Sequence, residues 1–155
     1  MAYEKRHEKP CLFLEEVFGT TVHPMQLKRA GYAVRCFAEA FRTGDPKGDP
    51  VRDPQIIEYC HAEKLVLVTM DKNIRFTHVD TIKKTDVAII ATESSDKYSP
   101  ATWVAALILG KPKILTAIKR YPRPWFAHLS TTGELRKIER ITPEMTTRRD
   151  RPDEQ

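Results

Sequence analysis

Cysteine is scarce in this sequence, and its spacing excludes two common ways of stabilising a small fold. The 155 residues contain three cysteines, Cys11, Cys36 and Cys60, and no C-x-x-C pair. An odd number of widely spaced cysteines supports neither a zinc knuckle nor a disulfide framework. We therefore expect reduced thiols in the core of a cytoplasmic protein.

Long apolar runs are missing as well. No segment approaches the roughly 18 apolar residues of a membrane span, so the sequence predicts a protein with no membrane association. The polar start at residues 1–9 is not followed by an apolar signal region, and no secretory targeting is expected. The net charge of +5 is moderate and favours a polyanionic partner only weakly.

Several catalytic signatures are also absent. The sequence contains no glycine-rich phosphate loop, no G-x-S-x-G turn and no histidine triad. The first absence speaks against binding of nucleoside triphosphates or dinucleotides, and the other two speak against serine-type hydrolysis.

What the sequence does contain is an alternation of strand-like and helix-like segments, which predicts a three-layer α/β domain with a mainly parallel central sheet. Two segments flanking Thr131-Thr132-Gly133 predict a C-terminal β-hairpin. Strands are expected at residues 10–14, 32–37, 65–69 and 87–92, helices at 22–30, 53–64 and 99–120 with a break at 110–112, a short helix or turn after 71, and irregular structure at 38–50. The domain is expected to span residues 10–141, between a polar N-terminal extension at 1–9 and a disordered tail at 142–155.

The most informative segment is an apolar strand, residues 65–69, that ends in Met70 and Asp71. A buried parallel strand delivers the residues that follow it to the carboxyl edge of its sheet, where open α/β folds place their chemistry. Glu15 and Glu16 follow the first strand, and Asp53 opens a helix. Clustered carboxylates are the ligands that Mg²⁺ and Mn²⁺ prefer. Such an ion activates water and neutralises developing phosphorane charge, so this pattern favours metal-assisted phosphodiester hydrolysis.

Each of these polar residues also has a simpler interpretation. Asp53 stands before Pro54 as a helix cap would, and Asp71 suits a cap of the turn after its strand. The pair Glu15-Glu16 suits the positive end of the following helix. Asn73 fits an amide ligand or a turn residue equally well, and the hydroxyl before Asp71 either bonds locally or orients that aspartate.

Taken in order, four segments resemble the landmarks of PIN-like domains, most closely the VapC-like toxin branch. The resemblance covers roughly residues 10–140 and rests on Leu14-Glu15-Glu16, Ala30-Gly31-Tyr32-Ala33-Val34, Asp53-Pro54-Gln55-Ile56-Ile57 and Val66-Leu67-Val68-Thr69-Met70-Asp71-Lys72-Asn73-Ile74-Arg75. It implies an Mg²⁺- or Mn²⁺-dependent ribonuclease, commonly the toxin of a toxin–antitoxin pair. The implied partners are an RNA substrate and a cognate antitoxin protein, and a homodimer is left open.

Matched position by position, the resemblance implies that Glu15, Asp53 and Asp71 are catalytic. The same three residues, with Glu16 and Asn73, are implied to be metal ligands. The family usually has aspartate where Glu15 stands, and often a second acid where Asn73 stands. The side chain of Glu15 is therefore one methylene longer than the usual aspartate. Asn73, which is uncharged, makes the site less negative than a second acid would.

Basic residues near the active strand are candidates for RNA contacts. Lys72, Arg75 and Lys84 follow that strand and would track a phosphate backbone, although ordinary solvated charges are the alternative for each of them.

Two other functions compete with the nuclease interpretation. A phosphoacceptor receiver domain also combines N-terminal acids, a strand-end aspartate, a later strand-end threonine such as Thr92 and a Lys-Pro pair such as Lys111-Pro112. The second competitor is a non-catalytic binding module in which the PIN-like fold persists and the acids only cap helices.

Overall fold

The computed structural model describes residues 10–41, 53–71, 73–92 and 98–145, with the side chains of Arg75 and Phe76 left undescribed. The expected N-terminal extension, the loop at 43–50, Lys72 and residues 146–155 of the expected tail lie outside these ranges.

Six strands form a single sheet in the order β2-β1-β3-β4-β5-β6. The first five are parallel, and β6 runs antiparallel to β5. Their bounds are β1 Cys11–Leu14, β2 Ala33–Cys36, β3 Val66–Thr69, β4 Ala88–Ala91, β5 Trp125–Leu129 and β6 Leu135–Arg140. The predicted α/β fold, with a mainly parallel sheet and a C-terminal hairpin, is confirmed.

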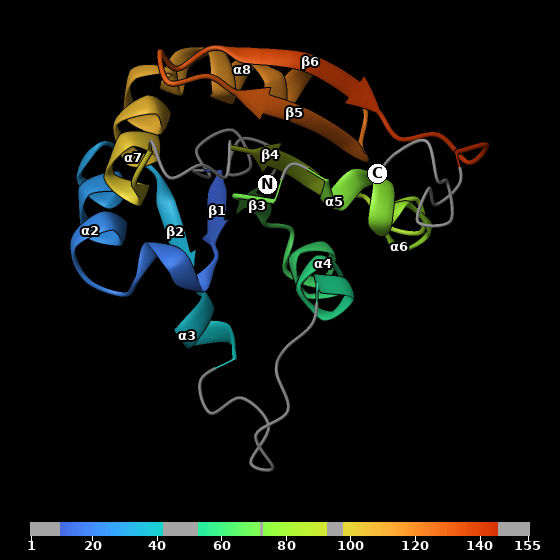
Figure 1. The fold of residues 1–155 in the computed structure, drawn as a ribbon, viewed down its shortest axis with the longest axis horizontal. Helices are drawn as coiled ribbons and strands as arrows, with labels where there is room; N and C mark the ends of the chain where they lie inside the picture. The colour runs from blue at the N-terminus through green and yellow to red at the C-terminus, as the bar shows by residue number, and fades with distance from the viewer. Residues whose placement is uncertain (1–9, 42–52, 72, 93–97, 146–155) are drawn as a thin grey trace, which may run out of the picture.

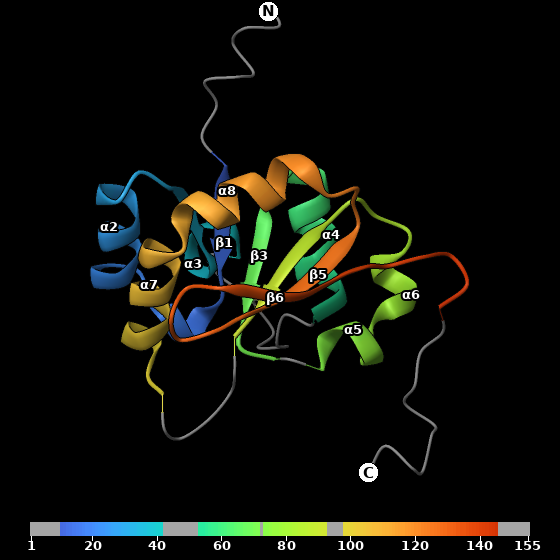
Figure 2. The same ribbon diagram turned by 90° about the horizontal axis from the view of Figure 1, so that it is seen from above.

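Helices cover both faces of this sheet (Figures 1 and 2). On one face the core includes Leu27 of α2, Trp103 of α7 and Ile114 of α8. On the other face it includes Ile57 of α4 and Ile82 of α6. The bounds are η1 Glu16–Phe18, α2 Val22–Arg29, α3 Phe37–Ala40, α4 Asp53–Glu63, α5 Ile74–Thr77, α6 Val79–Ile82, α7 Pro100–Leu109 and α8 Lys111–Arg120.

The central strands β3 and β4 are buried along their whole lengths. Because helices cover both of their faces, every position can be apolar, and this explains why these two strands appear in the sequence as unbroken apolar runs. Residues on alternate faces divide between the two core clusters: Val66 and Val68 belong to the first, and Leu67 belongs to the second.

The turn of the C-terminal hairpin packs against the junction between α7 and α8. A Cβ added to Gly133, which has φ +85°, would lie 2.7 Å from the backbone nitrogen of Gly110 and 2.9 Å from the carbonyl oxygen of Ala106. This approach of two backbones requires glycine at the turn. Within the hairpin, a bulge shifts the register between Phe126 and His128 and coincides with a left-handed φ of 52° at Lys137.

The structure differs from the sequence prediction in its short elements. The single turn α3 lies in the stretch expected to be irregular, and it begins with a reciprocal cap in which Glu39 Oε1 accepts the Cys36 N–H at 2.8 Å. Residues 142–145, expected in the tail, are attached to the fold: Lys83 Nζ donates to the Met145 carbonyl at 2.9 Å. In the described ranges no single helix is long and apolar enough to cross a membrane; only α7 and α8 together reach that length and composition, across a bend of 73°.

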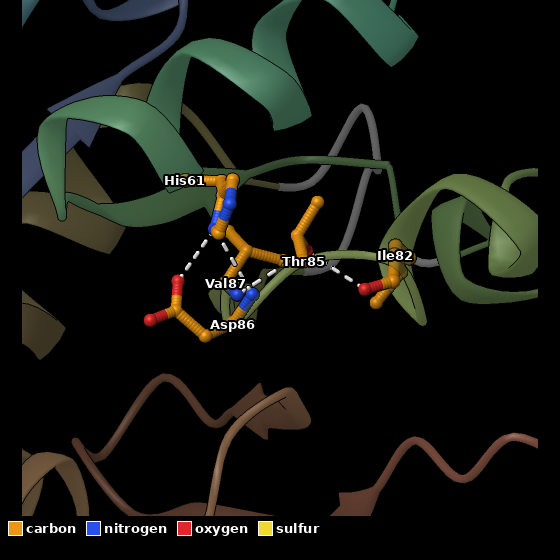
Figure 3. Close-up of polar contacts among 5 residues, drawn as sticks. All are labelled: His61, Ile82, Thr85, Asp86 and Val87. Atoms are coloured by element: carbon orange, nitrogen blue, oxygen red, sulfur yellow. Dashed lines mark hydrogen bonds and ion pairs between the residues drawn. The ribbon is translucent and has the colours of Figure 1, made fainter.

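At the amino edge of the sheet, a polar cluster joins α4 to the start of β4 (Figure 3). His61 Nδ1 lies 2.6 Å from Asp86 Oδ1 and 3.1 Å from the backbone nitrogen of Asp86. The Thr85 hydroxyl donates to the Ile82 carbonyl at 2.7 Å, which closes the last turn of α6. These contacts explain the cluster as a connection between secondary-structure elements.

Candidate active site at the carboxyl edge of the sheet

The strand order reverses direction between β1 and β3, and open α/β sheets bind ligands at such a switch point, beyond the carboxyl ends of the strands. Glu15 directly follows β1, and Asp71 lies two residues beyond β3. The two acids therefore flank the crevice, as the sequence predicts. Figure 2 shows β1 and β3 side by side, with α5 just beyond the end of β3.

The carboxylate of Glu15 is held at this crevice by the neighbouring strand. Its Oε1 accepts the backbone N–H of Met70 at 3.2 Å. Burial raises the pKa of Glu15 above its ordinary value, and the negative charges of Asp53 and Asp71 raise it further; hydrogen bonds from Thr69 and Met70 oppose the rise. Asp53 and Asp71 therefore each lie within electrostatic reach of Glu15.

Thr69, the last residue of β3, forms hydrogen bonds with both acidic segments of the site. It is fully buried, and its hydroxyl oxygen accepts the backbone N–H of Asp71 at 3.0 Å. The same hydroxyl is a hydrogen-bond partner of Glu15. Its carbonyl accepts the backbone N–H of Thr92 at 2.8 Å, which joins the ends of β3 and β4. The Thr69 hydroxyl therefore has both of the roles expected for it. It forms a local hydrogen bond, and that bond orients the segment that carries Asp71.

Asp71 and Asp53 approach the crevice from different elements. Asp71 is exposed, and its Oδ1 accepts the backbone N–H of Asn73 at 2.9 Å in a tight turn. Asp53 lies in the first turn of α4, where Oδ2 is 3.6 Å from His78 Nε2. His78 precedes α6 and is a site residue that the sequence analysis missed, since no local pattern links it to an acid 25 positions earlier.

The donors are suited to a hard divalent cation in their chemistry, because they are carboxylate and hydroxyl oxygens. Within the described ranges, however, no three of the His, Cys, Asp and Glu side chains are already gathered closely enough to hold a metal ion. The side chains of Glu15, Asp53 and Asp71 would have to come closer to one another to share a metal ion. Exposed Asp71 and partly exposed Asp53 have room to do so, whereas Glu15 is held by its hydrogen bond to the Met70 N–H.

The remaining predicted residues are less closely associated with the crevice. Glu16 is exposed at the start of η1, and Asn73 contributes its backbone N–H to the Asp71 turn. Lys84 lies between α6 and the start of β4, which is the opposite edge of the sheet from the acids. Lys72 and the side chain of Arg75 lie outside the described part of the chain.

A row of aligned residues connects the acidic crevice to basic side chains. Thr69 pairs with Ala91 on β4, Ala91 pairs with His128 on β5, and His128 pairs with Arg136 on β6. Leu14 pairs with Val68, so Glu15 continues this row on β1. Paired residues on neighbouring strands point to the same face, and the row therefore carries acid at one end and base at the other. The basic end was not expected from the sequence, because it depends on the register of five strands.

Of the residues that a receiver domain would bring together, the structure places Lys111 away from Asp71. Lys111 Nζ donates to the carbonyl of Ala30 at 2.8 Å, at the end of α2 and just before β2 begins. That position is at the amino edge of the sheet, away from Asp71. Thr92, the other residue of that comparison, is buried and bonded to Thr69.

Comparison with known proteins adds no assignment to this geometry: no family model, curated protein or solved structure matches the chain.

Proposed function

We propose that this protein is an Mg²⁺- or Mn²⁺-dependent endoribonuclease that acts in the cytoplasm as the toxin of a toxin–antitoxin pair. The observation that carries the proposal is geometric: Glu15 and Asp71 follow the neighbouring strands β1 and β3 at the switch point of the sheet, and Glu15 is bonded to the Met70 N–H there. Burial raises the pKa of Glu15, and the charges of Asp53 and Asp71 add to the rise. The negative charges of Asp53 and Asp71 act unfavourably on the partly buried Glu15 carboxylate, and a divalent cation drawn between them would relieve that repulsion.

In this proposal Glu15 supplies the fixed carboxylate, because Met70 and Thr69 hold it by hydrogen bonds. Asp71 swings from the turn that Thr69 supports, and Asp53 approaches from the start of α4. When bound, the cation would activate a water molecule and neutralise charge on the attacked phosphate. Basic residues at the far end of the aligned row would hold the RNA backbone.

A second candidate is a non-catalytic binding module with the same fold. It is favoured by the separation of the three acids in the described residues and by the local bond between Asp71 and the Asn73 backbone. In that case the acids shape turns and helix ends, and a metal ion has no effect on the protein.

An RNA cleavage assay distinguishes the two candidates. Purified protein is incubated with structured RNAs in Mn²⁺ or in EDTA, beside Asp71→Asn and the control Glu58→Gln, which removes an exposed acid from the middle of α4. The nuclease proposal predicts cleavage by the wild type and the control in Mn²⁺ only, and none by Asp71→Asn. Equal cleavage under all conditions would identify a contaminating nuclease and contradict the proposal.

A further inference from the structure

A second hollow opens at the same edge of the sheet, beyond the ends of β4 and β5. Its volume of about 400 Å³ falls within the range that small-molecule pockets occupy. Its lining includes Ala91, Tyr98, Trp103, His128, Arg136 and Lys137. None of these residues was predicted as a binding residue from the sequence.

The aligned row places this pocket next to the acids. Ala91 and His128 line the pocket and continue the row that contains Glu15 and Thr69. Neighbouring strands are about 4.8 Å apart, so the β4 and β5 positions lie roughly 5 and 10 Å from Thr69. That separation suits neighbouring nucleotides of one strand, with one in the pocket and the next phosphate at the acids.

The rim of the pocket on β6 is positively charged. Arg136 is exposed, lies opposite His128 in the hairpin, and has Nη2 3.2 Å from Glu134 Oε2. Lys137 follows Arg136 at the bulge. Its backbone φ of 52° is a conformation that residues other than glycine rarely adopt. Bulges redirect side chains, and strained residues concentrate at binding sites. Two cations adjacent in sequence therefore line one pocket.

The lining of the pocket also contains two aromatic side chains. Tyr98 is half-buried and meets Trp103 edge to face, with ring centroids 5.6 Å apart and planes at 70°. Trp103 is buried, so the half-buried Tyr98 is the ring of this pair that a ligand can reach. An aromatic ring and two cations in the lining of one pocket supply the two elements with which proteins bind single-stranded nucleic acid, a stacking surface and a phosphate contact.

We propose that this pocket binds one nucleotide of a single-stranded RNA, with the base against Tyr98 and the phosphate at Arg136 and Lys137. The assignment of RNA as the strand rests on the proposed nuclease function. The pocket then determines which nucleotide lies beside the acids, and with it the position of the cut.

Binding of a short fluorescein-labelled single-stranded RNA, measured by anisotropy in EDTA, tests the pocket without any cleavage. Tyr98→Leu is expected to weaken binding about fivefold to a hundredfold, the effect of losing one stacked base. Tyr98→Phe keeps the ring and is expected to bind like the wild type. The control Tyr121→Leu removes an exposed tyrosine beside a different pocket, between α8 and β6.

The phosphate interactions are tested by the salt dependence of the same binding. The double variant Arg136→Gln/Lys137→Asn, in which asparagine tolerates the left-handed backbone, is expected to reduce the slope of log K against log salt by about 0.7 for each phosphate that is no longer neutralised. Lys113→Gln/Arg120→Gln removes the same charge from the pocket on α8 and is expected to leave the slope unchanged.

The proposed nucleotide pocket would be overturned if the two double variants weakened RNA binding equally, or if Tyr98→Leu bound RNA as tightly as the wild type. These outcomes are independent of the nuclease proposal. If the wild type fails to cleave RNA in Mn²⁺ but its binding depends on Tyr98, Arg136 and Lys137, the nuclease proposal fails and the pocket stands. If Asp71-dependent cleavage occurs while the pocket variants bind normally, the reverse holds.

Discussion

The carboxylate of Glu15, at the end of β1, accepts the backbone N–H of Met70, at the end of β3, with 3.2 Å between nitrogen and oxygen. This bond spans the switch point of the sheet and anchors one acid of the candidate site to the strand that carries another. It also makes the site dependent on the β3 end, where Thr69 contacts both acidic segments.

The first prediction concerns the pH dependence of stability. Burial, with added repulsion from Asp53 and Asp71, raises the pKa of Glu15 in the folded protein. The folded state then holds this proton more tightly than the unfolded state, so in EDTA the free energy of unfolding falls as pH rises from the ordinary carboxyl pKa through the raised one. Each tenfold difference in proton affinity corresponds to about 1.4 kcal/mol.

The variant Glu15→Gln cannot titrate and is expected to lack this decline. Urea unfolding of both proteins across that pH window measures the difference. Parallel stability curves for wild type and variant would show that Glu15 has no raised pKa.

The second prediction concerns the buried hydroxyl. Thr69→Val leaves the Asp71 N–H without its acceptor and removes a donor to Glu15, so the free energy of unfolding is expected to fall by about 1–3 kcal/mol. Thr69→Ser keeps the hydroxyl and is expected to retain most of the stability. Urea denaturation compares the two, and an equal loss of stability in both variants would show that the hydroxyl is not the group that stabilises this strand end.

The third prediction separates the helix role of Asp53 from its metal role. Its carboxylate is about one-third exposed and its pairing with His78 is long, so Asp53→Asn is expected to change stability in EDTA by less than about 1 kcal/mol. In Mn²⁺ at roughly 100 times its dissociation constant, the wild type should gain about 2.7 kcal/mol by mass action. Asp53→Asn is expected to lose most of this gain, as measured by thermal unfolding, while Glu58→Gln keeps it. A full Mn²⁺ gain in Asp53→Asn would remove that residue from the site.

The fourth prediction concerns the docking of the hairpin. In Gly133→Ala the alanine must adopt a left-handed φ of 85°. Its Cβ would also lie 2.7 Å from the backbone nitrogen of Gly110 and 2.9 Å from the carbonyl oxygen of Ala106. Gly19→Ala is the matched control, since φ is 73° and nothing lies within 4 Å of the added Cβ. The control is expected to cost about 1–3 kcal/mol from its backbone conformation alone, because φ 73° with ψ −165° is a region that essentially only glycine adopts, and Gly133→Ala is expected to cost more because it adds the backbone contacts. Equal losses in thermal unfolding would mean that the hairpin turn can move away from α7 and α8.

The layered fold was predictable from local patterns, because β3 and β4 are buried on both faces and appear as unbroken apolar runs. The start of α4 was likewise evident from Asp53-Pro54. The single turn α3 was not, since its cap joins a cysteine to a glutamate, a pair that seldom marks a helix start.

The acidic side of the candidate site could be anticipated because Glu15 and Asp71 each follow a strand. His78 and the basic residues of β6 could not be anticipated, because their positions depend on strand register and on the path of α5 and α6. Lys84 illustrates the same limit. It is close to Asp71 in sequence, but α5 and α6 carry the chain from the carboxyl end of β3 to the amino end of β4, where Lys84 lies.

Direct measurement of Mn²⁺ binding by calorimetry tests the central claim that Glu15, Asp53 and Asp71 share a cation. We predict saturable binding to the wild type and a loss of affinity of at least about tenfold in Asp71→Asn and in Glu15→Gln, with Glu58→Gln unchanged. No binding to the wild type, or the same affinity in all four proteins, would contradict it.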